Sequence, residues 1–189
     1  GEALVVLAHQ ERKSRYNISK CDAQAQQQDG QWNITGTKSV VAAGDHADAF
    51  LVPAMAAGKL ALFLVAKGAK GASAAGYVTQ DGGRAAELTL SQTPAALVTL
   101  DGLTALNHAV DIGIACACAE GVGVMDKTMA ITVDYMNTRK QFNTTIATFQ
   151  ALRHRVADMK MQLELGRSMS YYASLKLNTP AAERHQAMA

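Results

Sequence analysis

The sequence predicts an α+β fold, in which an antiparallel β-sandwich or barrel is followed by long helices of a partial four-helix bundle. In residues 1–100, apolar runs of roughly four to eight residues alternate with Gly, Asp and Asn clusters, a pattern typical of short strands. In residues 101–189 the apolar residues recur at helical spacing, and no proline lies between Gly102 and Gln150. We therefore expect one domain at 1–100 and a second at 101–189.

Seven segments of the first hundred residues carry the strand pattern. They are Leu4–Ala8, Asp22–Gln27, Trp32–Val41, Ala49–Val52, Leu60–Val65, Tyr77–Thr79 and Glu87–Leu90. Between the second and third segments, Asp29-Gly30 predicts a tight hairpin, because Gly readily takes the positive φ that a primed turn demands. Further turns are expected at 43–46 and 81–83.

In the first predicted helix, apolar residues are spaced three and four apart, which places them on one helix face. These residues are Val122, Met125, Met129, Val133 and Met136. The first helix could extend over Gly102–Arg139, a second amphipathic run covers about 152–177, and Pro180 ends it before a third helix starts at 181–189. Helices of this length usually pack in bundles, so further helices or a partner subunit must cover their apolar faces.

Charge and composition exclude several classes of protein. The 18 Lys and Arg residues nearly balance the 16 Asp and Glu residues, and their scattered positions argue against nucleic acid as a partner. Cys21, Cys116 and Cys118 form no CxxC pair, which argues against a disulfide framework or zinc site and favours a reducing compartment. No apolar stretch reaches about 18 residues without charge, so we expect a cytoplasmic protein with no membrane span.

Familiar catalytic motifs are absent from the sequence, which has no Walker loop, HExxH, GxSxG or metal-ligand spacing. The Gly-Val-Gly at 121–123 lies in helix-prone sequence, so it favours helix packing over phosphate binding. The five histidines are dispersed, and we interpret them as surface or satisfied core side chains. Cys116 and Cys118 are two residues apart on the predicted helix, so they point to different faces and cannot readily share a metal.

One segment of the helical half carries a distinctive spacing. It reads Tyr135-x-x-x-Arg139-x-x-Phe142, then Ile146, Phe149-Gln150 and Ala157-Asp158-Met159. This set resembles the signature at the turn between two long helices in the acyl-CoA dehydrogenase family. The family has glycine after the Phe, and this chain has Asn143. Because Asn is the commonest non-glycine residue at positive φ, we expect the turn to survive.

The first hundred residues resemble the middle domain of the same family. The strand pair W-x-I-x-G-x-K at 32–38 and A-D-x-x-L-V at 47–52 matches it, and Ala8–Tyr16 stands in place of the family's T-E-P-x-x-G-S-D loop. The form of that loop, Glu11 followed by Ser14-Arg15-Tyr16, and the segment at 81–88 are similar to a bacterial branch that includes pimeloyl-CoA dehydrogenase small-subunit-like proteins. The resemblance spans essentially the whole chain.

The resemblance implies an FAD-dependent enzyme of fatty acid metabolism. Such an enzyme oxidises an acyl-CoA to a trans-2-enoyl-CoA, passes electrons to an electron-transferring flavoprotein and assembles as a dimer or tetramer. It also implies FAD contacts for these residues: Gln10, Ser14, Ala42, Arg139, Gln141, Phe142, Ile146, Phe149 and Gln150. Arg139, Phe142 and Gln150 suit the adenine and pyrophosphate end of FAD, since they supply a cation, a flat apolar face and an amide. In the family this segment reaches the FAD of a neighbouring subunit.

The chain also departs from the family at three further positions. Val40 stands where members often have Trp, and Ala42 where many have Thr, which leaves backbone amides to hold the flavin ring. The catalytic carboxylate of most members lies near the C-terminal end of the protein, beyond residue 189 here, and some members place it at about Gly113, which cannot abstract a proton. We therefore assign no catalytic residue.

Three interpretations follow from these departures. The first is a fragment of an acyl-CoA dehydrogenase, inactive alone, as the end of the chain at Ala189 inside helix-prone sequence also suggests. The second is a non-catalytic FAD-binding or structural subunit of a heteromeric acyl-CoA dehydrogenase. The third is an unrelated β-sandwich joined to a helical hairpin.

Overall fold

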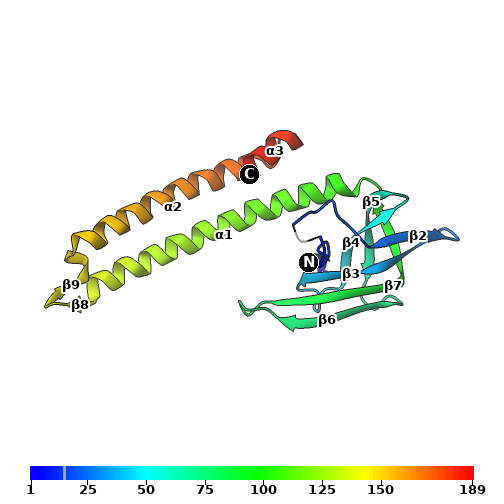
Figure 1. Ribbon diagram of the computed structural model, residues 1–189, viewed down its shortest axis with the longest axis horizontal. Coiled ribbons are helices and arrows are strands. Elements are labelled where there is room, and N and C mark those ends of the chain that lie inside the picture. The colour runs from blue at the N-terminus through cyan, green and yellow to red at the C-terminus, as the bar shows by residue number, and fades with distance from the viewer. Residues whose placement is uncertain (15) are drawn as a thin grey trace. The chain divides into compact units, whose positions relative to one another are not determined.

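The computed structural model describes residues 1–14 and 16–189, so Arg15 of the predicted loop motif lies outside the described residues (Figure 1). The chain divides into two compact units, Gly1–Asn107 and His108–Ala189. The first is hereafter called the β unit and the second the helical unit. The fold class predicted from the sequence is confirmed.

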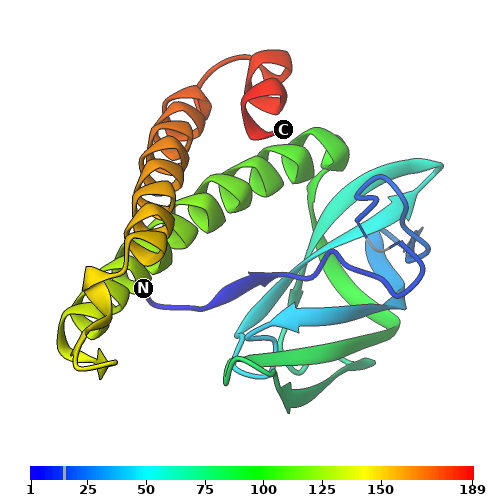
Figure 2. The ribbon, with the colours of Figure 1, turned by 60° about the vertical axis from the view of Figure 1, so that its left-hand side comes forward.

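The β unit is a closed barrel. Its strands are Val5–Leu7 (β1), Gln24–Gln28 (β2), Gln31–Ala42 (β3), Ala49–Ala56 (β4), Lys59–Ala66 (β5), Ala72–Val78 (β6) and Arg84–Thr99 (β7). The order β4, β5, β7, β3, β2 returns to β4 and closes the ring, while β1 and β6 are added beside β4 and β7 (Figure 2). The pairings are antiparallel, as predicted, except for the parallel pairs β1–β4 and β2–β4. The contact between β2 and β4 that closes the ring is a single residue pair, Gln24 with Met55.

The seven predicted strands are all present, but β7 is far longer than predicted. The sequence pattern ended at Leu90 because Ser91, Gln92 and Pro94 follow it. In the structure β7 continues to Thr99, since it pairs with β6, β3 and β5 in turn. Gln92 takes a left-handed φ of 48° beside the shift in register between β3 and β7. Pairing with three neighbours therefore overrides the polar interruption.

The predicted hairpin and core of the β unit are also present. Asp29 and Gly30 have φ values of 50° and 82°, as a primed two-residue turn requires. The barrel interior is filled by small and medium apolar side chains, and Trp32 packs on Phe63 with ring centroids 5.3 Å apart. These side chains include Ala8, Ile34, Phe50, Val52, Val65, Leu88 and Leu90.

The helical unit holds most of α1 (Gly102–Thr138), then β8 (Lys140–Gln141), β9 (Thr144–Thr145), the 3₁₀ helix η1 (Ile146–Thr148), α2 (Gln150–Lys176) and α3 (Ala181–Met188). The β8–β9 hairpin reverses the chain, and α2 runs back alongside α1 (Figures 1 and 2). The ends of α1 and α2 lie within two residues of those predicted. The short helix predicted after Pro180 is α3.

Helix α1 is unusually apolar. By length and composition it could cross a membrane, since an 18-residue window has a mean hydropathy of 1.4, and only 17% of that window is buried in this chain. The mean hydropathy of a window can be high even when the window contains a few charged residues. Helix α1 therefore meets the hydropathy criterion, although it has no stretch of about 18 apolar residues without charge. The expectation that the chain has no membrane span stays a prediction.

Candidate functional site

The predicted turn between the two long helices is formed by left-handed residues. The N–H of Arg139 donates to the carbonyl of Tyr135 (2.8 Å) at the end of α1. Phe142 and Asn143 then have φ values of 53° and 64°, and they form the two-residue loop between β8 and β9. Asn143 therefore adopts the backbone conformation for which glycine is favoured, and the predicted survival of this turn is confirmed.

The hairpin leaves an aromatic side chain in solvent. Phe142 is 87% exposed, and its ring meets that of Phe149 edge to face, with centroids 6.1 Å apart and an interplanar angle of 86°. Phe149 is the residue before α2, and no side chain caps that helix. Helix N-termini attract anions, and no acidic residue occupies the first turn of α2. An exposed aromatic face thus adjoins an electropositive helix end.

The remaining predicted residues of this segment lie close by in the chain. Gln141 is exposed on β8, and its side-chain amide donates to the carbonyl of Lys140 (2.8 Å). Ile146 is half-buried at the start of η1, where its N–H donates to the carbonyl of Arg139 (2.9 Å). Gln150 is exposed as the first residue of α2. The six predicted residues therefore form one continuous surface segment, and their role in binding FAD stays a prediction.

The β unit has a groove of about 510 Å³ beside the end of β3. Its lining residues are Gln10, Glu11, Arg12, Tyr16, Ser39, Val40 and Glu87. Gln10 accepts a hydrogen bond from the N–H of Ser39 through its carbonyl (2.8 Å). The groove thus brings together Gln10, predicted as an FAD contact, and Val40, which stands in the position of the family's Trp.

Val40 has an unusual backbone conformation in this groove. Its φ of 53° is rare for a β-branched residue, and its side chain is 54% exposed. Glu87 on β7 supports the bulge, because its carboxylate accepts hydrogen bonds from the Ser39 hydroxyl (3.0 Å) and the Val40 N–H (3.4 Å). Arg12 lies 3.8 Å from the same carboxylate. No local sequence pattern marks Glu87 as part of this groove, because only the pairing of β3 with β7 brings it near residues 39–40.

The other two predicted residues of the β unit lie outside the lining of this groove. The Ser14 hydroxyl donates to the carbonyl of Glu11 (3.0 Å) and accepts from its N–H (3.1 Å), so both bonds close a local turn. Ala42 is exposed at the end of β3, paired with Ala85. Both assignments to FAD stay predictions.

A buried ion pair underlies the groove. Lys38 is fully buried, and its Nζ lies 2.6 Å from Oε1 of Glu11, which also accepts backbone N–H bonds from Asp22 and Ala23. Burial alone raises the pKa of Glu11, but the bond from Lys38 and the two backbone bonds outweigh it and hold the pKa below its ordinary value. Burial and the nearby Lys38 charge lower the pKa of His9. The alternation of β3, with buried Ile34 and Lys38 four apart, could have indicated an inward lysine that needs a carboxylate partner.

The carboxylate nearest in sequence to the alternative catalytic position of the helical unit is already paired. Gly113 is exposed on α1, and the nearest carboxylate before it, Asp111, is only 3% exposed. The two oxygens of Asp111 contact Nε of Arg184 (2.6 Å) and Nδ1 of His185 (3.1 Å), both on α3. Asp111 therefore holds α3 against α1 rather than acting as a base.

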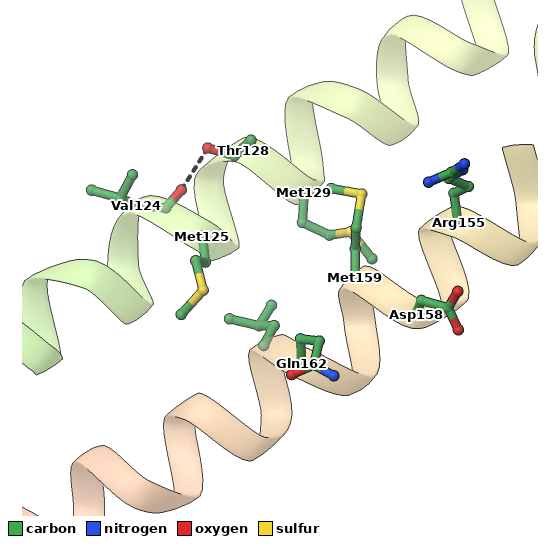
Figure 3. A pocket seen from close by; sticks show the side chains of 9 residues that line it. Val124, Met125, Thr128, Met129, Arg155, Asp158, Met159 and Gln162 are labelled. Carbon is green, nitrogen blue, oxygen red and sulfur yellow. Dashed lines mark hydrogen bonds between the residues drawn. The ribbon is translucent and has the colours of Figure 1, made fainter. Parts of the chain in front are cut away.

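A second hollow, of about 500 Å³, lies between α1 and α2 (Figure 3). Met125 and Met129 of α1 face Met159 of α2 across it, and Arg155 and Asp158 lie at one end. Within the described residues, no group of three or more His, Cys, Asp or Glu side chains could hold a metal ion. The lining is that of an apolar seam in a helical bundle.

Comparisons with known proteins agree with the geometry. Residues 101–189 match the family model described as the acyl-CoA dehydrogenase C-terminal domain. The chain is 34% identical over 130 residues to acyl-CoA dehydrogenase FadE27 of Mycobacterium tuberculosis. The matched region covers 67% of this chain and 34% of FadE27. It resembles the solved structure of a variant of the Tcur3481-Tcur3483 steroid ACAD, with 28% identity, a TM-score of 0.86 and coverage of 100% of this chain and 51% of that one.

A further similar structure is the ChsE4-ChsE5 complex from Mycobacterium tuberculosis, with 25% identity and a TM-score of 0.80, covering 99% of this chain and 51% of that one. The chain thus spans about half the length of these solved chains, and its match to FadE27 covers about a third of that protein.

The chain belongs to the acyl-CoA dehydrogenase family, whose members are FAD-binding oxidoreductases. The prediction from the two motifs is confirmed, and the unrelated sandwich is excluded. The pimeloyl-CoA branch stays a prediction. The family model also covers the whole of the apolar helix α1.

Proposed function

We propose that these 189 residues supply a middle β domain (1–100) and the first bundle helices (101–189) of an acyl-CoA dehydrogenase that oxidises an acyl-CoA to a trans-2-enoyl-CoA. The observation that carries this proposal is the left-handed turn at Phe142 and Asn143, which keeps the family signature despite the lost glycine. The turn sets Arg139 and Phe142 on the exposed end of the helix pair, next to the open N-terminus of α2.

The residues of that segment fit a dinucleotide cofactor. Arg139 would neutralise phosphate, the N-terminus of α2 would add hydrogen-bond donors, and Phe142 offers a flat surface to the adenine ring. In the β unit, the groove at Gln10 and Val40 would take the flavin end. FAD, when bound, accepts hydride from the β-carbon of the acyl-CoA. The chain's own part is to bind and orient the cofactor.

The proton-abstracting base lies outside these 189 residues in this proposal. Gly113 has no side chain for the purpose, and both oxygens of Asp111 are occupied by Arg184 and His185. We expect the chain alone to be inactive. Further helices or a partner subunit would complete the bundle as a dimer or tetramer, an electron-transferring flavoprotein would reoxidise the flavin, and the cytoplasm would be the location.

The alternative is a non-catalytic, FAD-binding or structural subunit of a heteromeric acyl-CoA dehydrogenase. It is favoured by Gly113 together with the similarity to a structure described as a complex of ChsE4 and ChsE5. An activity assay distinguishes the catalytic proposal from the non-catalytic one. The protein from the complete reading frame is assayed alone and after co-purification with a second dehydrogenase subunit. Turnover alone supports the first proposal, and turnover only in the pair supports the second.

The cofactor role of Arg139 is tested by the substitution Arg139→Ala in the protein from the complete reading frame. Losing a charge-assisted phosphate contact is expected to weaken FAD binding about tenfold or more. The readout is the ratio of visible flavin absorbance to protein after gel filtration. Lys140→Ala removes the neighbouring exposed cation and should leave flavin content unchanged. Equal flavin content in all three proteins would contradict the assignment.

A further inference from the structure

A cluster of three reactive side chains lies beneath the groove of the β unit, and the proposed function gives the cluster no chemical role. Nζ of Lys38 lies 2.6 Å from Oε1 of Glu11 and 3.4 Å from Sγ of Cys21. The Cys21 thiol in turn lies 3.4 Å from the same Oε1. The thiol and the amine thus share one carboxylate oxygen and face each other at contact distance.

The exposure of the three groups differs in a way that matters for chemistry. Lys38 is fully buried and Glu11 is 6% exposed, whereas Cys21 is only partly buried, so it is the most accessible of the three residues. Burial raises the pKa of the Cys21 thiol, which therefore keeps its proton. The Glu11 carboxylate lies 3.4 Å from the sulfur and is the acceptor for that proton as peroxide attacks.

We propose that Cys21 and Lys38 form an oxidative modification site, at which hydrogen peroxide produces a covalent bond between Sγ and Nζ. In the first step, peroxide transfers one oxygen to the sulfur, which is oxidised to a sulfenic acid while peroxide is reduced to water. Glu11 takes the thiol proton and returns it to the departing hydroxide.

In the second step, Lys38 passes a proton to Glu11 and its free amine attacks the sulfur. The S–N bond forms as the S–O bond breaks, and hydroxide leaves with a proton from the nitrogen as a second water. The sulfur has lost two electrons overall, both taken by peroxide, and Glu11 ends protonated. The product ties the segment before β2 to β3 and removes the cation beside Glu11.

The positions of aspartates in the sequence make this bond easy to detect. Asp22 and Asp29 lie between Cys21 and Lys38, so a protease that cleaves before aspartate puts the two residues on separate peptides. Treatment of the folded full chain with hydrogen peroxide, followed by this digestion and mass spectrometry, should yield the two peptides linked and lighter by two hydrogen atoms. A thiol reductant should restore the separate peptides. Cys116 and Cys118, exposed on α1, are internal controls that should form no lysine link.

Two variants identify the partners of the bond. Cys21→Ser should abolish the linked peptide. Lys38→Arg keeps a cation beside Glu11 but removes the reactive amine, so dimedone should label Cys21 in this variant and much less in the unaltered protein. The inference is overturned if peroxide oxidises Cys21 of the folded chain without linking it to Lys38, if Cys21 stays reduced, or if the urea-unfolded chain gives the link to the same extent.

Discussion

The two units of this chain bury their apolar residues to very different extents. Ile34 and Phe63 in the barrel are fully buried, whereas Met169 and Leu175 on α2 are 60% and 79% exposed. A closed barrel satisfies its own edges and interior, but two antiparallel helices have a single seam to bury. Contacts within this chain therefore bury the apolar residues of the β unit but leave many apolar side chains of the helical unit exposed.

The largest effect is expected from Lys38→Met in the β unit. The substitution leaves the Glu11 carboxylate buried without its cation, so the free energy of unfolding should fall by about 3–5 kcal/mol. Urea unfolding followed by circular dichroism measures it. Lys59→Met, at an exposed position on β5, should change stability little. An equal loss in both variants would show that the buried pair is not what stabilises the barrel.

Acid should weaken the β unit through the same pair. The folded pKa of Glu11 lies below its ordinary value of 4.5, so its contribution to stability is present above that value and is lost as the pH falls through the folded pKa. Urea unfolding of the unaltered protein and of Glu11→Gln, compared between about pH 6 and pH 3, measures this loss. The variant should have the shallower dependence, and parallel curves would contradict the assignment.

In the helical unit, Asp111→Asn should release α3 from α1. The buried carboxylate holds both Arg184 and His185, and weakening these contacts is expected to cost about 1–3 kcal/mol of local stability. Hydrogen exchange of residues 181–188 should accelerate. Asp126→Asn, which breaks an exposed ion pair to Arg167 on α2, should cost about 1 kcal/mol or less. Unchanged exchange in α3 would mean that other contacts hold it.

The exposed faces of the helical unit should control association. Leu165 is 56% exposed on α2, so Leu165→Glu should change the stability of the single chain by less than about 0.5 kcal/mol while weakening any oligomer. Light scattering during gel filtration measures the mass. Ser168→Glu adds the same charge at a nearby polar position and serves as the control. If both variants keep the mass of the unaltered protein, this face is not an interface.

A small effect on stability is expected at the left-handed turn of the helical unit. Asn143→Ala should cost about 1 kcal/mol, and Asn143→Gly should be neutral or slightly stabilising. Thermal unfolding of the two variants is the measurement. Asp29 in the barrel hairpin has a similar φ, so Asp29→Ala should give a similar loss if the cost is local. A loss at Asn143 only would indicate that the turn is strained by α1 and α2.

Much of the fold was predictable because it depends on neighbours in the sequence. The presence of the seven strands, the ends of α1 and α2 and the turn at Asp29-Gly30 follow from apolar spacing and from φ preferences, although β6 starts five residues before the predicted Tyr77. The closure of the barrel through β2 and β4 and the length of β7 were not predictable from the sequence. Both arise from pairing between strands that are distant in the sequence.

The candidate site also contains residues that a local motif predicts and residues that it does not. Arg139, Phe142 and Gln150 belong to one continuous segment, so the spacing of a motif was enough to select them. Glu87, which supports the bulge at Val40, is on another strand, and no local pattern marks it.

By itself, the sequence determined the family, the succession of β and helical halves, and the left-handed turn that Asn143 preserves. The tertiary structure alone decided which charged groups became buried partners: Glu11 with Lys38, 27 residues apart, and Asp111 with Arg184, 73 residues apart. The physical reason is that backbone preferences act over a few residues, whereas the desolvation of a charge is set by whichever distant segments the fold packs around it.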